Sequence, residues 1–276
     1  MLFLPFRADL EHFRFPWLTL LIALACVVVL IVQQQSDVRF LVAAEDFCRD
    51  RGPALWRMTM RRVGEDPSPA GCLRHMVKLD AAPDPERRLH ALAARGRPLA
   101  GLDGRADRDY KYSVLAARFH RFEALVPRRV TPDLWYVPGS WDPWHMLTSV
   151  FAHADWGHLV GNLVFFFAFA ASVEVLLGTL VYLLVFLGLA LGTGVFYSLS
   201  MLGWPDAPPT LGLSGVVMGM MGLFAALVPG GRIRTLVWFL LFLRVVSIPA
   251  WVLVLVYAGL DAWRLFGLGA DQGVNL

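Results

Sequence analysis

The sequence predicts an all-α membrane protein, a polytopic bundle of transmembrane helices with a large polar insert after the first helix. Hydrophobic residues make up 57% of the 276 residues and the mean hydropathy is +0.55, whereas ordinary soluble domains are roughly 45–50% apolar. Charged residues gather near the N-terminus and in residues 37–142, and long windows elsewhere carry no charge. Most of these windows can cross the hydrocarbon core of a bilayer, which takes about 20 apolar residues.

The uncharged windows set the expected helices. Five transmembrane helices are predicted, at residues 16–33, 156–177, 179–200, 212–228 and 245–263. The first window is longer than the roughly 7–15 apolar residues of a secretory signal, and the run from Gln33 to Ser36 offers no small-residue cleavage site. An uncleaved first helix is therefore favoured over a signal peptide.

Arginines in the short loops predict the orientation of the bundle, because cytoplasmic loops carry an excess of Lys and Arg. Arg7 and Arg14 precede the first helix, and further arginines lie at residues 232–244. The loop between the third and fourth helices carries only Asp206. We therefore expect an integral protein of a bacterial inner (cell) membrane, in contact with the lipid bilayer and with its N-terminus in the cytoplasm.

The insert divides the chain into three expected parts. Residues 1–36 hold the N-terminus and first helix, residues 37–143 form an extracytoplasmic first loop, and residues 144–276 form the membrane core. Cys48 and Cys72 both fall in this loop, where they could form a disulfide if the loop lies in an oxidising compartment.

The insert also has helix signals of its own. Asp84-Pro85-Glu86 offers an N-cap, a proline for the first helical position and an acid favoured by the helix dipole, with Gly96 as a stop. Residues 107–125 are a second helix candidate. The basic residues form no stripe interleaved with aromatic residues, so nucleic acid is not an expected partner.

Polar residues in the second predicted helix require partners or a function, because polar groups are costly in a bilayer. His158 and Asn162 are four residues apart, so they lie on one face of a helix. The residues alone leave open whether they donate hydrogen bonds in catalysis or bind a neighbouring helix. A metal site at His153 and His158 is disfavoured, since a five-residue spacing turns them about 140° apart and no further ligand stands beside them.

The second polar motif is Gly212-Leu213-Ser214-Gly215, which opens a glycine-rich apolar run. By itself the tetrapeptide is a weak signal, since a serine in a flexible loop has the same pattern. Its position at the start of a membrane helix favours a catalytic role, because free N–H groups and the positive end of the helix dipole there can stabilise an oxyanion. Gly215 and Gly219 are four residues apart and allow another helix to pack closely.

Taken together, the motifs resemble the rhomboid family of intramembrane serine proteases. His153, His158 and Asn162 come first, then Glu174 with Leu177-Gly178, and then Gly212-Leu213-Ser214-Gly215, in the order and approximate spacing of that family. The resemblance covers residues 144–222, and the other helices match only in hydropathy and order.

The resemblance implies a six-helix bundle, of which five helices are present, and a Ser-His dyad that needs no cofactor or metal. Ser214 would be the nucleophile that cleaves transmembrane protein substrates. His158, Asn162 and the Ser214 backbone N–H would form the oxyanion hole. His153 would support the site, and the further matching positions would complete it: Glu174, Gly212, Gly215, Gly219 and Trp144.

Two departures from the family pattern are visible. The family often has a Trp-Arg pair before the first histidine, whereas this chain has Trp144-His145. The family places its catalytic base on the sixth helix, yet none of the seven histidines follows Ser214. We expect a truncated chain of an ordinary rhomboid, since the serine and oxyanion groups are retained, and the loss of the sixth helix would leave Gly215 and Gly219 without their packing partner.

Two other functions remain open at this point. One is a catalytically inactive rhomboid-like protein that binds or routes membrane clients. The other is a polar-lined transporter, which would require charged groups near the midplane of the membrane or paired broken helices. Apart from Glu174 and Arg244 at the edges, the predicted spans lack such groups.

Overall fold

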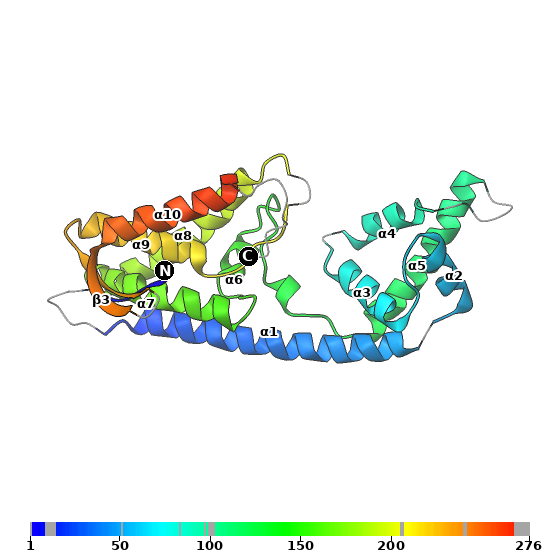
Figure 1. Cartoon of the computed structure of the whole chain (residues 1–276), viewed down its shortest axis with the longest axis horizontal. Coiled ribbons are helices and arrows are strands. Elements are labelled where there is room, and N and C mark those ends of the chain that lie inside the picture. The colour runs from blue at the N-terminus through cyan, green and yellow to red at the C-terminus, as the bar shows by residue number, and fades with distance from the viewer. Residues whose placement is uncertain are drawn as a thin grey trace. The chain divides into compact units, whose positions relative to one another are not determined.

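The computed structural model describes residues 2–8, 15–50, 52–82, 84–96, 98, 103–204, 207–239 and 242–267 (Figure 1), and only the backbone at 2–8, 234–239, 242–245 and 261–267. The chain forms two compact units. The membrane unit comprises Met1–Val32 and Asp133–Leu276, and the insert unit comprises Gln33–Pro132. Asp206, Arg14 and the last residues of the chain, which enter the predictions above, lie outside the described residues.

The membrane unit is built mainly of helices, which confirms the predicted helical membrane bundle. It contains the first half of α1 (Trp17–Arg49) and five further helices: α6 (Pro143–Ser149), α7 (Trp156–Leu177), α8 (Thr179–Ser200), α9 (Ser214–Leu227) and α10 (Ala250–Gly267). Among the described residues, α1, α7 and α8 are long and apolar enough to cross a membrane, and α9 is a shorter apolar helix. The predicted bounds of α7 and α8 are confirmed to the residue.

The first helix is longer than predicted. It runs for 33 residues, and it does not end near Gln33 but continues to Arg49. Its second half buries Phe40, Ala44 and Cys48, which are spaced by four residues and therefore lie on one face of the helix. The hydropathy window ended where this half changes from an apolar to an amphipathic pattern, so the prediction stopped too early.

A three-stranded antiparallel sheet accompanies the helices and was not predicted. Its strands are β1 (Leu2–Ala8), β2 (Arg232–Phe239) and β3 (Phe242–Pro249), in the order β1-β2-β3. The prediction of a helix from residue 245 was wrong, because residues up to Pro249 belong to β3 and α10 begins at Ala250. This segment is rich in β-branched and aromatic residues, which favour strands.

The core of the membrane unit is formed by side chains that recur every three or four residues on each helix. Those from α1 and α7 are Ile22, Cys26, Leu30, Phe166, Phe169 and Val173, and those from α8 and α9 are Tyr182, Phe186, Ala190, Val217, Met220 and Phe224. Large apolar side chains are also exposed on the outer faces of α1 and α8, for example Leu21, Leu24 and Leu184. Such faces suit a bilayer, where lipid covers them.

Glu174 is buried near the end of α7 and binds the start of α1. Its carboxylate accepts hydrogen bonds from the backbone N–H groups of Leu18 (3.0 Å) and Thr19 (2.8 Å) and from the Thr19 hydroxyl (2.7 Å). The Thr179 hydroxyl also donates to it at 3.3 Å. The first N–H groups of a helix lack partners within the helix, and an acidic group there is favoured by the helix dipole. Glu174 therefore joins α1 to α7.

The insert unit packs the second half of α1 with four helices: α2 (Ala54–Arg62), α3 (Pro69–Asp80), α4 (Pro85–Ala93) and α5 (Gly104–Leu125). Both helix signals in this region are confirmed. Asp84 caps α4 by accepting a hydrogen bond from the Arg87 N–H at 2.9 Å, and α5 contains the second predicted segment. A short 3-10 turn, η1 (Thr131–Asp133), follows.

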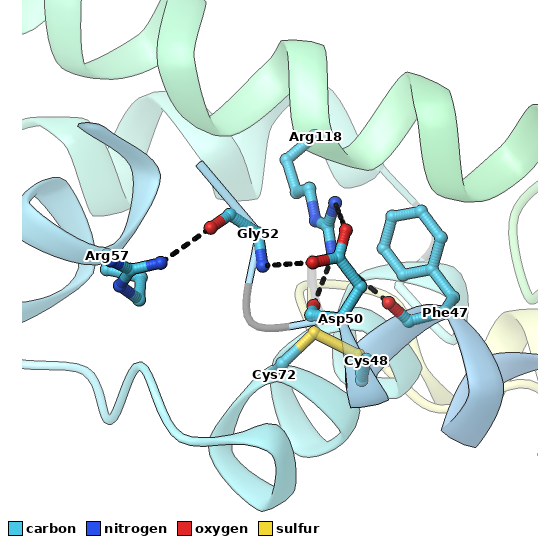
Figure 2. A network of polar contacts seen from close by, with 7 residues as sticks. All are labelled: Phe47, Cys48, Asp50, Gly52, Arg57, Cys72 and Arg118. Carbon is cyan, nitrogen blue, oxygen red and sulfur yellow. Dashed lines mark hydrogen bonds and ion pairs between the residues drawn. A yellow bond between two sulfur atoms is a disulfide. The ribbon is translucent and has the colours of Figure 1, made fainter. Parts of the chain in front are cut away.

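A disulfide and a buried arginine hold the end of α1 within the insert unit (Figure 2). Cys48 of α1 is bonded to Cys72 of α3. Arg118 of α5 donates hydrogen bonds to the carbonyl oxygens of Phe47 (3.1 Å) and Asp50 (3.0 Å), at the C-terminal end of α1. Its guanidinium also lies 3.9 Å from the centre of the Phe47 ring. The basic side chain thus occupies the helix end that favours a cation.

Candidate functional site

The loop of residues 207–213 leads into α9, and we call it the entry loop. Gly212 in this loop has φ +118°, a conformation that side chains other than glycine rarely adopt. A Cβ atom at this position would lie 2.8 Å from Cε1 and 2.9 Å from Nε2 of His158, and 3.6 Å from Nδ2 of Asn162. The backbone of the entry loop therefore approaches His158 as closely as only glycine permits, and Asn162 lies at an ordinary contact distance.

His158 and Asn162 lie on α7, as predicted from their spacing. Asp155 begins this helix, and its carboxylate accepts a hydrogen bond from the His158 backbone N–H at 2.9 Å. The Nδ1 atom of His158 and the Nδ2 atom of Asn162 are both buried, and neither has a hydrogen-bond partner among the described residues. Because most buried polar atoms in proteins are paired, two unpaired nitrogens on side chains that lie against Gly212 mark this place as a candidate site for a polar ligand.

His153 lies beside this pair and contacts the entry loop directly. Its ring is 5.2 Å from the ring of His158, centre to centre, and its Nε2 atom accepts a hydrogen bond from the Leu213 N–H at 3.4 Å. Since Nε2 accepts, Nδ1 carries the proton and donates to the Phe151 carbonyl oxygen at 3.2 Å. Burial, and secondarily the neighbouring His158, lower the pKa of His153 to about 4, which agrees with a neutral ring.

Metal binding by the two histidines gains no support from the geometry. Among the described residues no group of three His, Cys, Asp or Glu side chains is placed to hold a metal ion. The ring of His153 is already engaged through Nε2 with the Leu213 N–H.

Ser214 is the first residue of α9, and it is exposed. The preceding residue, Leu213, offers no side-chain hydrogen bond to the first turn of the helix. The leading N–H groups of an α-helix have no partners within the helix, so they face the space in front of Ser214. The Ser214 hydroxyl and the N-terminus of α9 thus follow Gly212 by two residues in the chain, and the side chains of His158 and Asn162 approach Gly212 in space.

Gly215 and Gly219 pack against α8. A Cβ atom at Gly215 would lie 2.7 Å from the Thr193 side chain, and one at Gly219 would lie 2.4 Å from Leu189. The expectation that these glycines allow a neighbouring helix to approach closely is confirmed. The expectation that a sixth helix is their packing partner is wrong, since α8 fills that place and so fixes the start of α9.

Two other predicted site residues lie elsewhere in the membrane unit. Glu174 is 16 residues after His158 on the same helix, about 24 Å along its axis, and it binds α1 rather than the entry loop. Trp144 lies on α6, is 67% exposed, and lines an apolar groove of about 350 Å³ with Leu18 and Leu183. In place of the family arginine, His145 pairs with Asp142 through Nδ1 and Oδ2 at 2.6 Å.

Four residues that were not predicted hold the entry loop: Tyr136, Ser149, Tyr197 and Ser198. The backbone groups of Tyr136 and Thr210 exchange two hydrogen bonds, at 2.9 and 2.8 Å, and the Tyr136 hydroxyl lies 2.5 Å from Oγ of Ser198 on α8. The Gly212 N–H donates to the Ser149 carbonyl oxygen at 2.8 Å. The Tyr197 hydroxyl donates to the carbonyl oxygen of Pro208 at 2.8 Å. None of these residues belongs to a recognisable motif, so no local signal marks them.

The fold and site together define a helical integral membrane protein with a polar site at the start of a membrane helix. Residues 140–270 match the family model described as Rhomboid domain, and this range includes His153, His158, Asn162, Gly212 and Ser214. This part of the chain is therefore similar to a rhomboid domain. No curated protein matches the chain. No solved structure matches it either.

Proposed function

We propose that the rhomboid domain is a serine endopeptidase that cleaves transmembrane protein substrates, with Ser214 as the nucleophile. The observation that carries the proposal is that His158 and Asn162, whose Nδ1 and Nδ2 atoms are buried and unpaired among the described residues, have side chains that lie against Gly212, two residues before Ser214. Acyl transfer needs hydrogen-bond donors aimed at an oxygen that becomes negative only in the transition state. Donors without partners in the resting protein fit that requirement.

In the proposed reaction the Ser214 hydroxyl oxygen attacks the carbonyl carbon of the scissile peptide, and its proton passes to a general base. The carbonyl oxygen becomes an oxyanion that accepts hydrogen bonds from His158, Asn162 and the leading N–H groups of α9. The leaving amine takes the proton, and an acyl-serine remains. A water molecule then attacks this ester, releases the new carboxyl end and restores the Ser214 hydroxyl.

The proposed reaction needs a general base for Ser214. A serine hydroxyl is a poor nucleophile until a neighbouring group removes its proton, and none of the seven histidines follows Ser214 in the sequence. His153 accepts a hydrogen bond from Leu213 through Nε2, so that nitrogen is not free to take a proton. His158 is assigned to the oxyanion. The proposal therefore takes its base from a group other than these two histidines, and the experiment below supplies a histidine on an added helix.

The absence of a histidine after Ser214 in the sequence favours a second candidate function, a rhomboid-like protein that binds membrane clients without cleaving them. Such a protein would need the packed bundle and the bilayer-facing surface but no base. The two candidates differ in one property, which is whether client turnover depends on Ser214.

The deciding experiment compares the protein with its Ser214→Ala variant in lipid nanodiscs, with a histidine-bearing helix appended after α10 in both. A peptidase should cleave a fluorescent transmembrane substrate and react with a fluorophosphonate probe, and Ser214→Ala should abolish both. Equal labelling of the two proteins would contradict the assignment of Ser214. Substrate retained without cleavage by either protein would favour client binding.

The oxyanion assignment predicts how Asn162→Ala changes the kinetics. Losing one such donor typically lowers kcat by about 10²–10³, with little change in KM, because the interaction exists only in the transition state. The matched control is Ser172→Ala on the same helix, since the Ser172 hydroxyl donates to the Ala168 carbonyl oxygen at 2.9 Å. A change in KM alone would instead indicate that Asn162 has a structural role.

A further inference from the structure

The entry loop carries Gly212 and leads directly to Ser214, yet residues 207–213 form no helix or strand of their own. The placement of the loop depends on contacts with other parts of the membrane unit, which include an isolated β-bridge between Thr210 and Tyr136. These contacts occur at Pro208, Thr210, Gly212 and Leu213, so nearly every second residue of the loop is held.

Tyr136 is the residue that connects the loop to the rest of the bundle. Its side chain is fully buried, and its backbone N–H and carbonyl groups pair with Thr210. Its hydroxyl lies 2.5 Å from Oγ of Ser198, which is also buried and which accepts a second hydrogen bond from the Gly139 N–H at 3.0 Å. One hydroxyl on α8 therefore fixes two points of the segment that carries Tyr136.

We propose that Tyr136 and Ser198 are positioning residues for Ser214, which hold the entry loop against α8 through their hydroxyl groups. Neither residue belongs to the His158, Asn162 and Gly212 group, so both act through the backbone at Thr210. The inference rests on the proposed role of Ser214 and adds to it the means by which the nucleophile is kept in register with the oxyanion donors. A misplacement of about 1 Å in such an arrangement can lower a rate by about 10²-fold.

A buried hydroxyl pair suits this task for two reasons. In a low-dielectric interior a hydrogen bond is stronger than in water, and an unpaired hydroxyl is costly, so the pair resists opening. The bond also has a direction, which an apolar contact lacks. The Tyr136 ring alone would fill the same space without fixing how far the Thr210 backbone lies from α8.

The test measures the position of residue 214 without relying on peptidase activity. In a Cys26→Ala background, Ser214→Cys places a thiol at the N-terminus of α9, where the helix end lowers the pKa of a thiol and speeds alkylation. The rate of alkylation by iodoacetamide is then followed as a function of pH. Adding Tyr136→Phe or Ser198→Ala should slow alkylation at pH 7 by on the order of fivefold and shift the profile to higher pH, because a displaced thiol loses the effect of the helix end.

Two control variants make the result decisive. Ser198→Thr keeps the hydroxyl and should restore the rate, which a general loss of packing would not allow. Ser200→Ala is the matched control, since the Ser200 hydroxyl donates only to the Tyr197 carbonyl oxygen of its own helix at 2.8 Å, and it should change nothing. If Tyr136→Phe fails to fold, the Ser198→Ala and Ser198→Thr pair decides alone.

Unchanged alkylation rates and pH profiles in Ser198→Ala and Tyr136→Phe would overturn the inference. That result is separate from a failure of the proposed function, which would show as peptidase activity that does not depend on Ser214. With the peptidase confirmed, both variants should lower kcat by about tenfold or more and leave KM nearly unchanged. Equal loss in Ser198→Thr and Ser198→Ala would also contradict a role for the hydroxyl.

Discussion

The two ends of α1 are held by opposite charges in two different environments. In the membrane unit, the buried carboxylate of Glu174 accepts three hydrogen bonds from the N-terminus of the helix and one from Thr179 of α8. In the insert unit, the guanidinium of Arg118 donates to two carbonyl oxygens at the C-terminus (Figure 2). Each charge has the sign that its end of the helix dipole favours.

The difference between the two ends lies in how completely each charge is satisfied. Glu174 has donors from both α1 and α8, so its oxygens need no water. Arg118 leaves its Nε atom without a partner among the described residues, but the Cys48–Cys72 disulfide stands beside it. An unpaired buried charge is costly. In the membrane unit hydrogen bonds alone satisfy Glu174, whereas in the insert unit the hydrogen bonds of Arg118 are accompanied by a disulfide.

Removing the carboxylate of Glu174 should have the largest effect of these changes. Glu174→Ala would leave the N–H groups of Leu18 and Thr19 unpaired in a buried site, at about 1–3 kcal/mol for each group. We expect a large fall in the thermal unfolding temperature of the protein in nanodiscs. The unfolding temperature of Glu174→Gln should lie between those of Glu174→Ala and the wild type. Thr179→Val removes only the 3.3 Å bond and should lower the unfolding temperature slightly. Equal stability of Glu174→Ala and the wild type would contradict the capping role.

Breaking the disulfide should affect the insert unit alone, and less strongly. The bond closes a loop with a sequence separation of 24 residues, and bonds of this kind contribute about 2–4 kcal/mol. Hydrogen exchange under reducing conditions should rise in α1 residues 40–49 and in α3, with little change in α7 to α9. The control is Cys26→Ala, whose response to reductant should match the wild type. A Cys48→Ala, Cys72→Ala double variant that still responds to reductant would contradict this prediction.

The smallest effect is expected at Arg118. Arg118→Met loses two bonds to carbonyl oxygens and the favourable charge at the helix end, together about 1–4 kcal/mol, while the disulfide still holds Cys48 in place. Denaturant unfolding of the insert unit measures the loss, and Arg121→Met on the exposed face of α5 is the matched control. If Arg118→Met destabilised the protein more than loss of the disulfide, the proposed ranking of the two devices would be reversed.

Much of the membrane unit follows from the sequence because its signals are local. The bounds of α7 and α8 are set by a capping Asp155 and by Gly178, which has φ +77°, and both features stand next to the apolar runs that they end. The sheet was missed because β1 and β2 are more than 220 residues apart, so their pairing leaves no pattern in either segment. The second half of α1 was missed because it is amphipathic, and its apolar face is buried by the core of the insert unit rather than by lipid.

The candidate site divides in the same way. The convergence of His158, Asn162 and Gly212 was expected because family motifs carry those residues in fixed order, and the structure brings them together. Glu174 belongs to the same motif order but acts on α1. Tyr136 and Ser198 are ordinary residue types 62 positions apart, and only the folded chain shows that their hydroxyl groups meet.

The Glu174 bonds also set an order of events during synthesis. Thr19 and Glu174 are separated by 155 positions in the chain. At about 5–20 residues per second, a ribosome needs roughly 8–30 s to make that stretch. For this interval the first helix has no carboxylate at its N-terminus, and its leading N–H groups must bind water or lipid headgroups. The bonds that join the start of α1 to Glu174 can therefore form only after α7 has been made.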